Sequence, residues 1–285
     1  MKTDTKNNEK YEDRSTELFS KLQISWESPK EEIWGDFSKR LKERPTIKIR
    51  PNIISWQMAA AAVLILTIGI SFFMRSYTKD INAMDGMHLT ASLPDGSTVY
   101  LNAGSKISYK PYWWFMDRIV DLDGEAFFEV KKGETFRVES PIGTTEVLGT
   151  SFNVMSRGRR YEVTCVTGKV KVEANSTKQS VIIHPAQKAS FQKSGQFKIE
   201  ENVNTENTRA WMSNRLVFTS VSLKEVFEEI ERQYKVEIIS PKGLALQYTG
   251  SFEKGNSAEE ILGLICRPFN LKVEKKSDKK FLILR

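Results

Sequence analysis

The stretch IISWQMAAAAVLILTIGISFFM, residues Ile53–Met74, decides how the rest of this chain is organised. It contains no charged residue and a single amide, Gln57, and Arg50 and Arg75 flank it. As a helix it would rise roughly 33 Å, which is enough to cross a hydrocarbon core of about 30 Å. We therefore predict a transmembrane helix within residues 51–76.

A cleaved signal peptide is the alternative explanation for such a run. Signal peptides begin near the N-terminus, have an apolar core of roughly 7–15 residues and end at a small-residue cleavage site. This run starts after some fifty residues, and the following Arg75-Ser-Tyr-Thr-Lys79 has no Ala-x-Ala pattern. The sequence therefore favours a permanent anchor.

Positive residues are unevenly distributed around the run. Six precede it closely, namely Lys39, Arg40, Lys42, Arg44, Lys48 and Arg50, whereas only Arg75 and Lys79 follow it. Because Lys and Arg favour the cytoplasmic side of a membrane, we expect a cytoplasmic N-terminus and an exported C-terminal part. This flank also supplies most of the net charge of +7, so the charge does not indicate direct binding of nucleic acid.

Residues 1–45 have the pattern of two short amphipathic helices. The apolar faces are Tyr11, Leu18, Phe19 and Leu22 in the first helix, and Ile33, Trp34, Phe37 and Leu41 in the second. The second is predicted to begin at Ser28-Pro29 and to end before Pro45. So small a unit buries its aromatic residues poorly, Trp26 among them. Either the two helices form a self-contained hairpin or, as we favour, a cytoplasmic partner covers them.

Residues 77–205 are predicted to form an all-β domain, either a sandwich or a solenoid-like stack. Short runs rich in Val, Phe, Tyr and Thr alternate with turn signals about every ten residues, and helical periodicity is absent. The turn signals are Leu93-Pro-Asp-Gly96, Asp123-Gly124, Lys132-Gly133, Arg157-Gly158, Thr167-Gly168 and Ser194-Gly195.

Residues 206–285 mix both periodicities in the order β-α-β-β-α-β-β, which predicts a compact α+β domain. Ser222 with Glu225, and Ser257 with Glu260, have the spacing of capping boxes at the starts of its two helices. The predicted buried faces are Leu223, Val226, Phe227, Ile230 and Tyr234 on the first helix and Ile261, Leu262 and Ile265 on the second. The predicted fold class is thus a multidomain membrane protein: a cytoplasmic helical segment (1–50), one transmembrane helix (51–76), an all-β domain (77–205) and a small α+β domain (206–285).

The sequence has no pattern typical of an enzyme. His88 and His184 stand in unrelated positions, and no catalytic triad, phosphate loop or metal-ligand spacing is found, so we expect no cofactor and no metal. Cys165 and Cys266 each lie in an apolar stretch. We interpret them as buried free thiols rather than as an exported disulfide, which an oxidising compartment would allow.

Pro111-Tyr-Trp-Trp-Phe115 is the densest group of aromatic residues in the exported part. It could form a sugar-stacking platform, which would make the protein a membrane-anchored periplasmic ligand-binding, or glycan-binding, module. The alternative, which we favour, is that these residues pack in the core or lie at a protein interface, where Trp and Tyr are enriched.

Several motifs in the exported part, taken in order, resemble the FecR family of transmembrane sigma-factor regulators, also called anti-sigma factors. These motifs are Leu93-Pro-Asp-Gly-Ser-Thr-Val-Tyr-Leu-Asn102, Gly124-Glu-Ala-Phe-Phe-Glu-Val130, Phe136-Arg-Val138, Val147-Leu-Gly-Thr-Ser-Phe-Asn-Val154 and Thr167-Gly-Lys-Val170. The C-terminal part is similar to secretin/TonB short N-terminal domains. The chain departs from the family in its short cytoplasmic part and in the absence of a glycine after Trp211.

The resemblance implies a regulator in the bacterial inner membrane. Its cytoplasmic part would bind an extracytoplasmic-function (ECF) sigma factor, and its periplasmic part would contact the signalling domain of a TonB-dependent outer-membrane receptor. The residues expected to bind the sigma factor are Leu18, Phe19, Leu22, Trp26, Ile33, Trp34 and Phe37. Release of the sigma factor would follow a change between two arrangements or cleavage by periplasmic and intramembrane proteases.

The resemblance also implies one covalent event. Some FecR-like proteins break their own chain at a Gly-Thr bond in this motif, which here is Gly149-Thr150. The Thr150 hydroxyl would attack the Gly149 carbonyl carbon and form an ester that water or rearrangement resolves. The alternative, which we favour, is that Gly149 marks a β-bulge and Thr150 is an ordinary strand residue.

Overall fold

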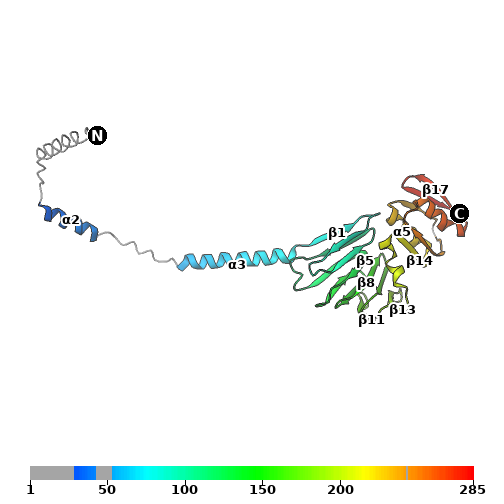
Figure 1. Cartoon of the computed structure of the whole chain (residues 1–285), viewed down its shortest axis with the longest axis horizontal. Coiled ribbons are helices and arrows are strands. Elements are labelled where there is room, and N and C mark those ends of the chain that lie inside the picture. The colour runs from blue at the N-terminus through cyan, green and yellow to red at the C-terminus, as the bar shows by residue number, and fades with distance from the viewer. Residues whose placement is uncertain (1–28, 43–52, 242) are drawn as a thin grey trace, which may run out of the picture. The chain divides into compact units, whose positions relative to one another are not determined.

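The computed structural model describes residues 29–42, 53–241 and 243–285 (Figure 1). The chain divides into two compact units, residues 1–62 and residues 63–285. The predicted first helix, with Leu18, Phe19 and Leu22, lies outside the described residues, as does Trp26.

Two of the three helices predicted before residue 77 lie in the described residues, and both are present. Helix α2 (Lys30–Lys42) begins directly after Pro29, whose carbonyl oxygen accepts a hydrogen bond from the Glu32 amide at 2.9 Å. Acidic residues in its first turn and basic residues in its last turn suit the helix dipole. Helix α3 (Ile53–Ser76) contains the predicted transmembrane run, and from Trp56 to Ser76 it is long and apolar enough to cross a membrane.

Residues 79–200 form two β-sheets that share one strand. The first sheet contains β1 (Lys79–Ala83), β4 (Ser105–Tyr109), β6 (Phe136–Glu139), β7 (Gly143–Val147), β10 (Val170–Ala174) and β11 (Ser180–Ile183). The second contains β2 (Leu89–Ser92), β3 (Thr98–Leu101), β8 (Ser151–Arg157), β9 (Arg160–Cys165), β12 (Lys188–Phe191) and β13 (Phe197–Glu200). Strand β5 (Arg118–Glu129) belongs to both, and its parallel pairing with β6 is the exception among antiparallel pairs in the described sandwich.

Strand β5 corrects one sequence prediction. Asp123-Gly124 was expected to be a turn, but both residues lie inside this twelve-residue strand. Its first half pairs with β4 and β6, whereas its second half, from Gly124, pairs with β3 and β8. Gly124 has a φ of +111°, and a Cβ there would lie 2.6 Å from Ser105 Oγ, so glycine is required where the strand bends from one sheet into the other. A bend of this kind and a true turn give the same signal in sequence.

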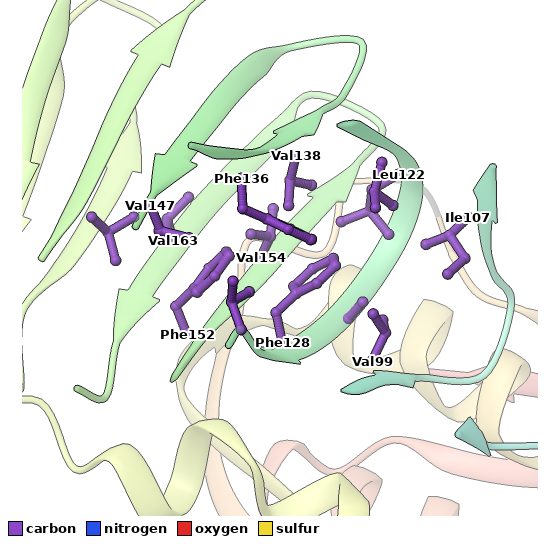
Figure 2. Packing of buried hydrophobic residues seen from close by; sticks show 14 of the residues in the cluster. Val99, Ile107, Leu122, Phe128, Phe136, Val138, Val147, Phe152, Val154 and Val163 are labelled. Carbon is purple, nitrogen blue, oxygen red and sulfur yellow. The ribbon is translucent and has the colours of Figure 1, made fainter. Parts of the chain in front are cut away.

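The two sheets enclose one hydrophobic core (Figure 2). The Phe128 ring, from the second sheet, stacks on Phe152 at a centroid distance of 5.2 Å. It also meets Phe136, from the first sheet, edge to face at 6.0 Å. Because side chains from both sheets fill a single core, the arrangement matches the predicted sandwich rather than the solenoid-like stack.

The C-terminal part has the predicted order β-α-β-β-α-β-β. Its elements are the short helices α4 (Thr205–Thr208), η1 (Ala210–Ser213) and η2 (Arg267–Phe269), helices α5 (Leu223–Tyr234) and α6 (Ala258–Cys266), and strands β14 (Arg215–Ser222), β15 (Glu237–Ile239), β16 (Gln247–Glu253), β17 (Lys272–Ser277) and β18 (Lys280–Leu284). A second hydrophobic cluster contains all the predicted buried residues of α5 and α6, with Tyr234 only partly buried. The sequence predicts two separate domains that divide at residue 205. Residues 63–285 form one compact unit in the structure, so this division stays a prediction.

One of the two predicted capping boxes is complete. Ser257 Oγ accepts from the Glu260 amide at 3.2 Å, and Glu260 Oε2 accepts from the Ser257 amide at 3.1 Å. At the start of α5, Ser222 Oγ accepts from the Glu225 amide, but the Glu225 carboxylate turns away and accepts from Arg160 of β9 at 3.0 Å. An ion pair to the sandwich therefore replaces half of the expected box.

Candidate functional site

The apolar face of α2 is the first candidate site. Trp34 is 70% exposed and Phe37 is 52% exposed, with ring centroids 5.9 Å apart, and Ile33 and Leu41 on the same face are also exposed. Contiguous exposed apolar surface of this kind typically marks a place where another molecule binds. The structure thus brings together Ile33, Trp34 and Phe37, three of the residues expected to bind a partner.

The second candidate site is a buried polar junction between the sandwich and α5. At its centre lies Gln233, whose side chain is only 1% exposed. Gln233 Nε2 donates to Asn102 Oδ1 at 2.7 Å and to Glu229 Oε1 at 2.8 Å. Gln233 Oε1 lies 3.0 Å from His88 Nε2, which makes the imidazole the donor in this contact. One glutamine therefore joins α5 to two separate loops of the sandwich.

The hydrogen-bond network continues from Asn102 into the strands of the second sheet. Asn102 Nδ2 donates to Glu125 Oε2 at 2.9 Å, and Asn153 Nδ2 donates to Glu125 Oε1 at 3.0 Å. Glu125 lies in β5 directly after the bend at Gly124. A groove of about 890 Å³ runs along this junction and is lined by both the sandwich and the C-terminal part.

Two partly buried carboxylates and two guanidinium groups lie close together at the junction. Burial raises the pKa of Glu125, and the negative charge of Glu229 raises it further. Burial also acts on Glu229, but Arg157 and Arg232 outweigh it and lower the pKa of that carboxyl. Arg232 Nη2 donates to Glu229 Oε2 at 2.8 Å, and Arg157 Nη2 donates to the Ala103 carbonyl at 2.8 Å. Buried charges of this kind need their partners, because a charge left alone in low dielectric is costly.

Strand β1 connects this junction to α3. Lys79, its first residue, follows the end of α3 at Ser76 after two residues. Beyond its last residue, the loop at Gly86 is bound to the C-terminal part: its amide donates to the Arg232 carbonyl at 2.7 Å, and its carbonyl accepts from Lys254 Nζ at 3.1 Å. The same short strand is therefore attached to the apolar helix at one end and to the junction at the other.

Sequence reasoning missed this junction, although one signal for it exists. Gln233 follows Ile230 by three positions and Val226 by seven, so it belongs to the apolar face of α5. A polar residue on a buried face needs a hydrogen-bond partner, and this was the sign of a contact beyond the C-terminal core. Its partners in the sandwich could not be found from spacing.

Gly149 and Thr150 occupy a constrained corner between β7 and β8. Gly149 has a φ of +145°, and a Cβ there would lie 2.7 Å from the Lys132 Cα, so the position requires glycine. The Thr150 hydroxyl is buried and has no hydrogen-bond partner in the described part of the chain. A hydroxyl nucleophile is normally activated by an adjacent base, and this geometry supplies none to Thr150.

The aromatic residues at 111–115 do not act as one group. Trp114 is buried, and its ring meets Tyr109 at 5.5 Å and Phe136 at 5.9 Å, so it belongs to the sandwich core. The Arg75 guanidinium lies over the Trp113 ring at 5.3 Å. Tyr112 and Phe115 are exposed. The predicted packing role is confirmed for Trp114.

Neither the two thiols nor the potential metal ligands among the described residues form a candidate site. Cys165 and Cys266 are free and buried, as predicted, and burial raises the pKa of each thiol to about 11. Within residues 29–42, 53–241 and 243–285, no group of three or more His, Cys, Asp or Glu residues could hold a metal ion.

Known families and structures resemble this chain over most of the part that follows α3. The family model described as FecR protein matches residues 79–171, and the model described as FecR, C-terminal, matches residues 215–283. Two crystal structures of a candidate anti-sigma factor from Parabacteroides distasonis ATCC 8503, at 2.50 Å and 1.65 Å resolution, are similar to it. Each aligns with 26% identity and a TM-score of 0.67 and covers 73% of this chain and 99% of the other. No curated protein sequence matches the chain.

Proposed function

The chain belongs to the FecR family of anti-sigma factors, and on this premise we propose that it sequesters an ECF sigma factor at the inner membrane and relays a signal from a TonB-dependent outer-membrane receptor. In this proposal α3 crosses the membrane once, with the N-terminus in the cytoplasm and residues 77–285 in the periplasm. The uneven distribution of Lys and Arg around α3 supports this orientation.

The uncovered apolar face of α2 carries the proposal. Trp34 and Phe37 together present two exposed rings on a helix that has no buried residue. A sigma factor would receive this face in a hydrophobic groove, as amphipathic helices are commonly bound. Trp in particular is enriched among the few residues that supply most of the binding energy of an interface.

The exported part would receive the receptor's signal. A signalling domain that binds there promotes release of the sigma factor only if it binds one arrangement of the exported part better than another. Because β1 follows α3 in the chain and the loop after β1 is hydrogen-bonded to the C-terminal part at the junction, a change at the junction has a short route to the membrane helix. Proteolysis next to the membrane is the other route to release, and we favour it because a single helix has few ways to transmit a rotation.

Capture of the sigma factor by the full-length protein tests this proposal. Truncating both Trp34 and Phe37 to Ala should remove two contacts of about 2 kcal/mol each, which weakens binding roughly 1,000-fold. The matched control is Glu32→Ala with Lys39→Ala, on the opposite face of the same helix and neutral in net charge. Equal binding by the two double variants would exclude this face as the sigma-binding surface.

No observation favours the alternative of a periplasmic glycan-binding module. A sugar platform needs neighbouring aromatic faces open to solvent, whereas Trp114 is in the core and Arg75 lies over the Trp113 ring. The alternative would regain support if Trp113→Ala abolished binding of a glycan and left the fold intact.

A further inference from the structure

The segment between β4 and β5 lies beside the point where the chain leaves α3. Lys79, three residues beyond Ser76 at the end of α3, pairs with Tyr109, the last residue of β4. Paired residues in antiparallel strands are about 5 Å apart, so residues 110–117 begin next to the exit of the helix. Side chains confirm the proximity, since the Tyr77 and Tyr112 rings are 5.3 Å apart and Arg75 lies over Trp113.

Large apolar side chains gather at this end of the sandwich. Phe115 is 74% exposed and Met116 is 62% exposed, and Tyr112 is about half exposed. Leu148, also exposed, directly follows β7, and the register of β7 on β6 and of β6 on β5 brings it to the same end. We call these four residues, Tyr112, Phe115, Met116 and Leu148, the loop surface.

Basic residues outnumber acidic ones beside the loop surface, where Asp117 and Glu134 are also exposed. Arg75, Lys79, Lys110 and Lys132 are exposed, and the segment that contains Lys132 is bound to the loop surface through the Gly133 amide, which donates to the Leu148 carbonyl at 3.0 Å. Apolar and aromatic side chains framed by Lys and Arg are typical of protein surfaces that lie in the headgroup region of a membrane. Cations there also attract anionic lipids.

We infer that the loop surface inserts into the headgroup region of the leaflet from which α3 emerges, and that it holds the sandwich against the bilayer. The inference rests on the proposed membrane crossing by α3. A lipid surface is favoured over a protein or glycan partner because the bilayer would begin at the end of α3, and residues 75 and 77 already contact this segment. The loop surface would thereby fix the tilt of β1 and of everything attached to it.

Depth measurements on the full-length protein in lipid vesicles test the inference. An environment-sensitive fluorophore is attached at Met116→Cys or, as a matched control, at Met84→Cys. Met84 is also a methionine, is 60% exposed and follows the far end of β1, which is about 17 Å long. The native Cys165 and Cys266 are buried and have raised pKa values, so they should label slowly.

The label at position 116 should emit at shorter wavelength, be quenched by lipids brominated near the headgroup and be protected from aqueous iodide. The label at position 84 should emit at longer wavelength, should not be quenched by the brominated lipids and should be quenched by aqueous iodide. Adding Phe115→Ser and Leu148→Ser should reduce the bromolipid quenching at position 116 without changing the far-UV circular dichroism, because both side chains are exposed.

Equal quenching at positions 116 and 84, or bromolipid quenching at 116 that survives the two serine substitutions, would overturn the inference. Alkaline extraction of the same vesicles separates this failure from failure of the proposed anchor. A protein that stays in the membrane while position 116 is accessible to iodide retains its anchor and lacks the loop contact. A protein that alkali releases was never anchored by α3.

Discussion

Replacing Gln233 by leucine should loosen the attachment of α5 to the sandwich. The substitution keeps a side chain of similar size at a position that is 1% exposed, so no large cavity forms. It removes three hydrogen bonds, those to Asn102, to Glu229 and to His88. Any loss of stability therefore reports the polar junction rather than packing.

The magnitude follows from which partners are left unsatisfied. Asn102 Oδ1 keeps a second donor, the Ala103 amide at 2.8 Å. Glu229 keeps its ion pair with Arg232 but loses the donor to Oε1, and His88 loses its acceptor. Two partly buried groups that each lose a partner cost about 3 kcal/mol together, and this corresponds to a roughly 100-fold more frequent opening of the junction.

Native-state hydrogen exchange of the full-length protein measures this opening. Amides of α5 and of the loop at Gly86 should exchange roughly 100-fold faster in Gln233→Leu, in line with the estimate above. Amides of β8, in the sandwich core, should exchange at the wild-type rate. Gln196→Leu, at an exposed turn, is the matched control and should leave all these rates unchanged.

Two results would refute the reasoning. Unchanged exchange in α5 would mean that the hydrogen bonds of Gln233 do not hold the helix to the sandwich. Equal acceleration in α5 and β8 would mean that the two parts open together, so that the junction is not a separate point of weakness.

Three further predictions concern single residues of the sandwich. Burial raises the pKa of Glu125, so the folded protein holds a proton that the unfolded chain releases, and stability should fall as pH rises from the ordinary glutamate range through the raised pKa. Urea unfolding at a series of pH values should show that Glu125→Gln flattens this fall and raises stability at neutral pH, and an unchanged profile would contradict the assignment. Gly124→Ala should lower stability by more than about 2 kcal/mol in thermal unfolding, because its Cβ would collide with Ser105, whereas Gly158→Ala, which has open space, should cost less. Mass spectrometry of the purified protein should find an intact chain, because the Thr150 hydroxyl has no hydrogen-bond partner to take its proton, and a fragment that starts at Thr150 and is lost in Thr150→Val would disprove this.

Local patterns were enough to predict most elements of the fold. The apolar run at 53–74, the periodicity of α2 and the alternation of strand and helix after residue 215 are each properties of a short window, and the structure has the corresponding helices and strands. The capping box at Ser257 was predictable for the same reason, since both of its residues lie within one turn.

The errors arose where a distant residue decides the local outcome. Gly124 looks like a turn residue in sequence until the pairing of β5 with four other strands is known, and those strands lie between residues 98 and 157. Glu225 was expected to cap its own helix, but Arg160, 65 residues away, takes its carboxylate. Gln233 pairs with Asn102 across 131 residues. The position of Gln233 on an apolar helix face indicates that it has a buried partner, but sequence spacing does not identify that partner, so the residues of the junction could be found only from the structure.

The chemistry of the junction suits a protein that must respond to a signal. An apolar interface resists separation because opening it exposes surface that water disfavours. Glu125, Glu229 and Gln233 form hydrogen bonds when the junction is closed, and water can satisfy the same groups when it is open, so opening costs less free energy than separating an apolar interface of the same area. In the proposed relay, a receptor domain would shift the equilibrium between the closed and open junction by binding one of the two arrangements better than the other. The hydrogen bonds of the closed junction also specify one position of α5 on the sandwich, because each donor must face its acceptor. A purely apolar contact would leave this position less defined.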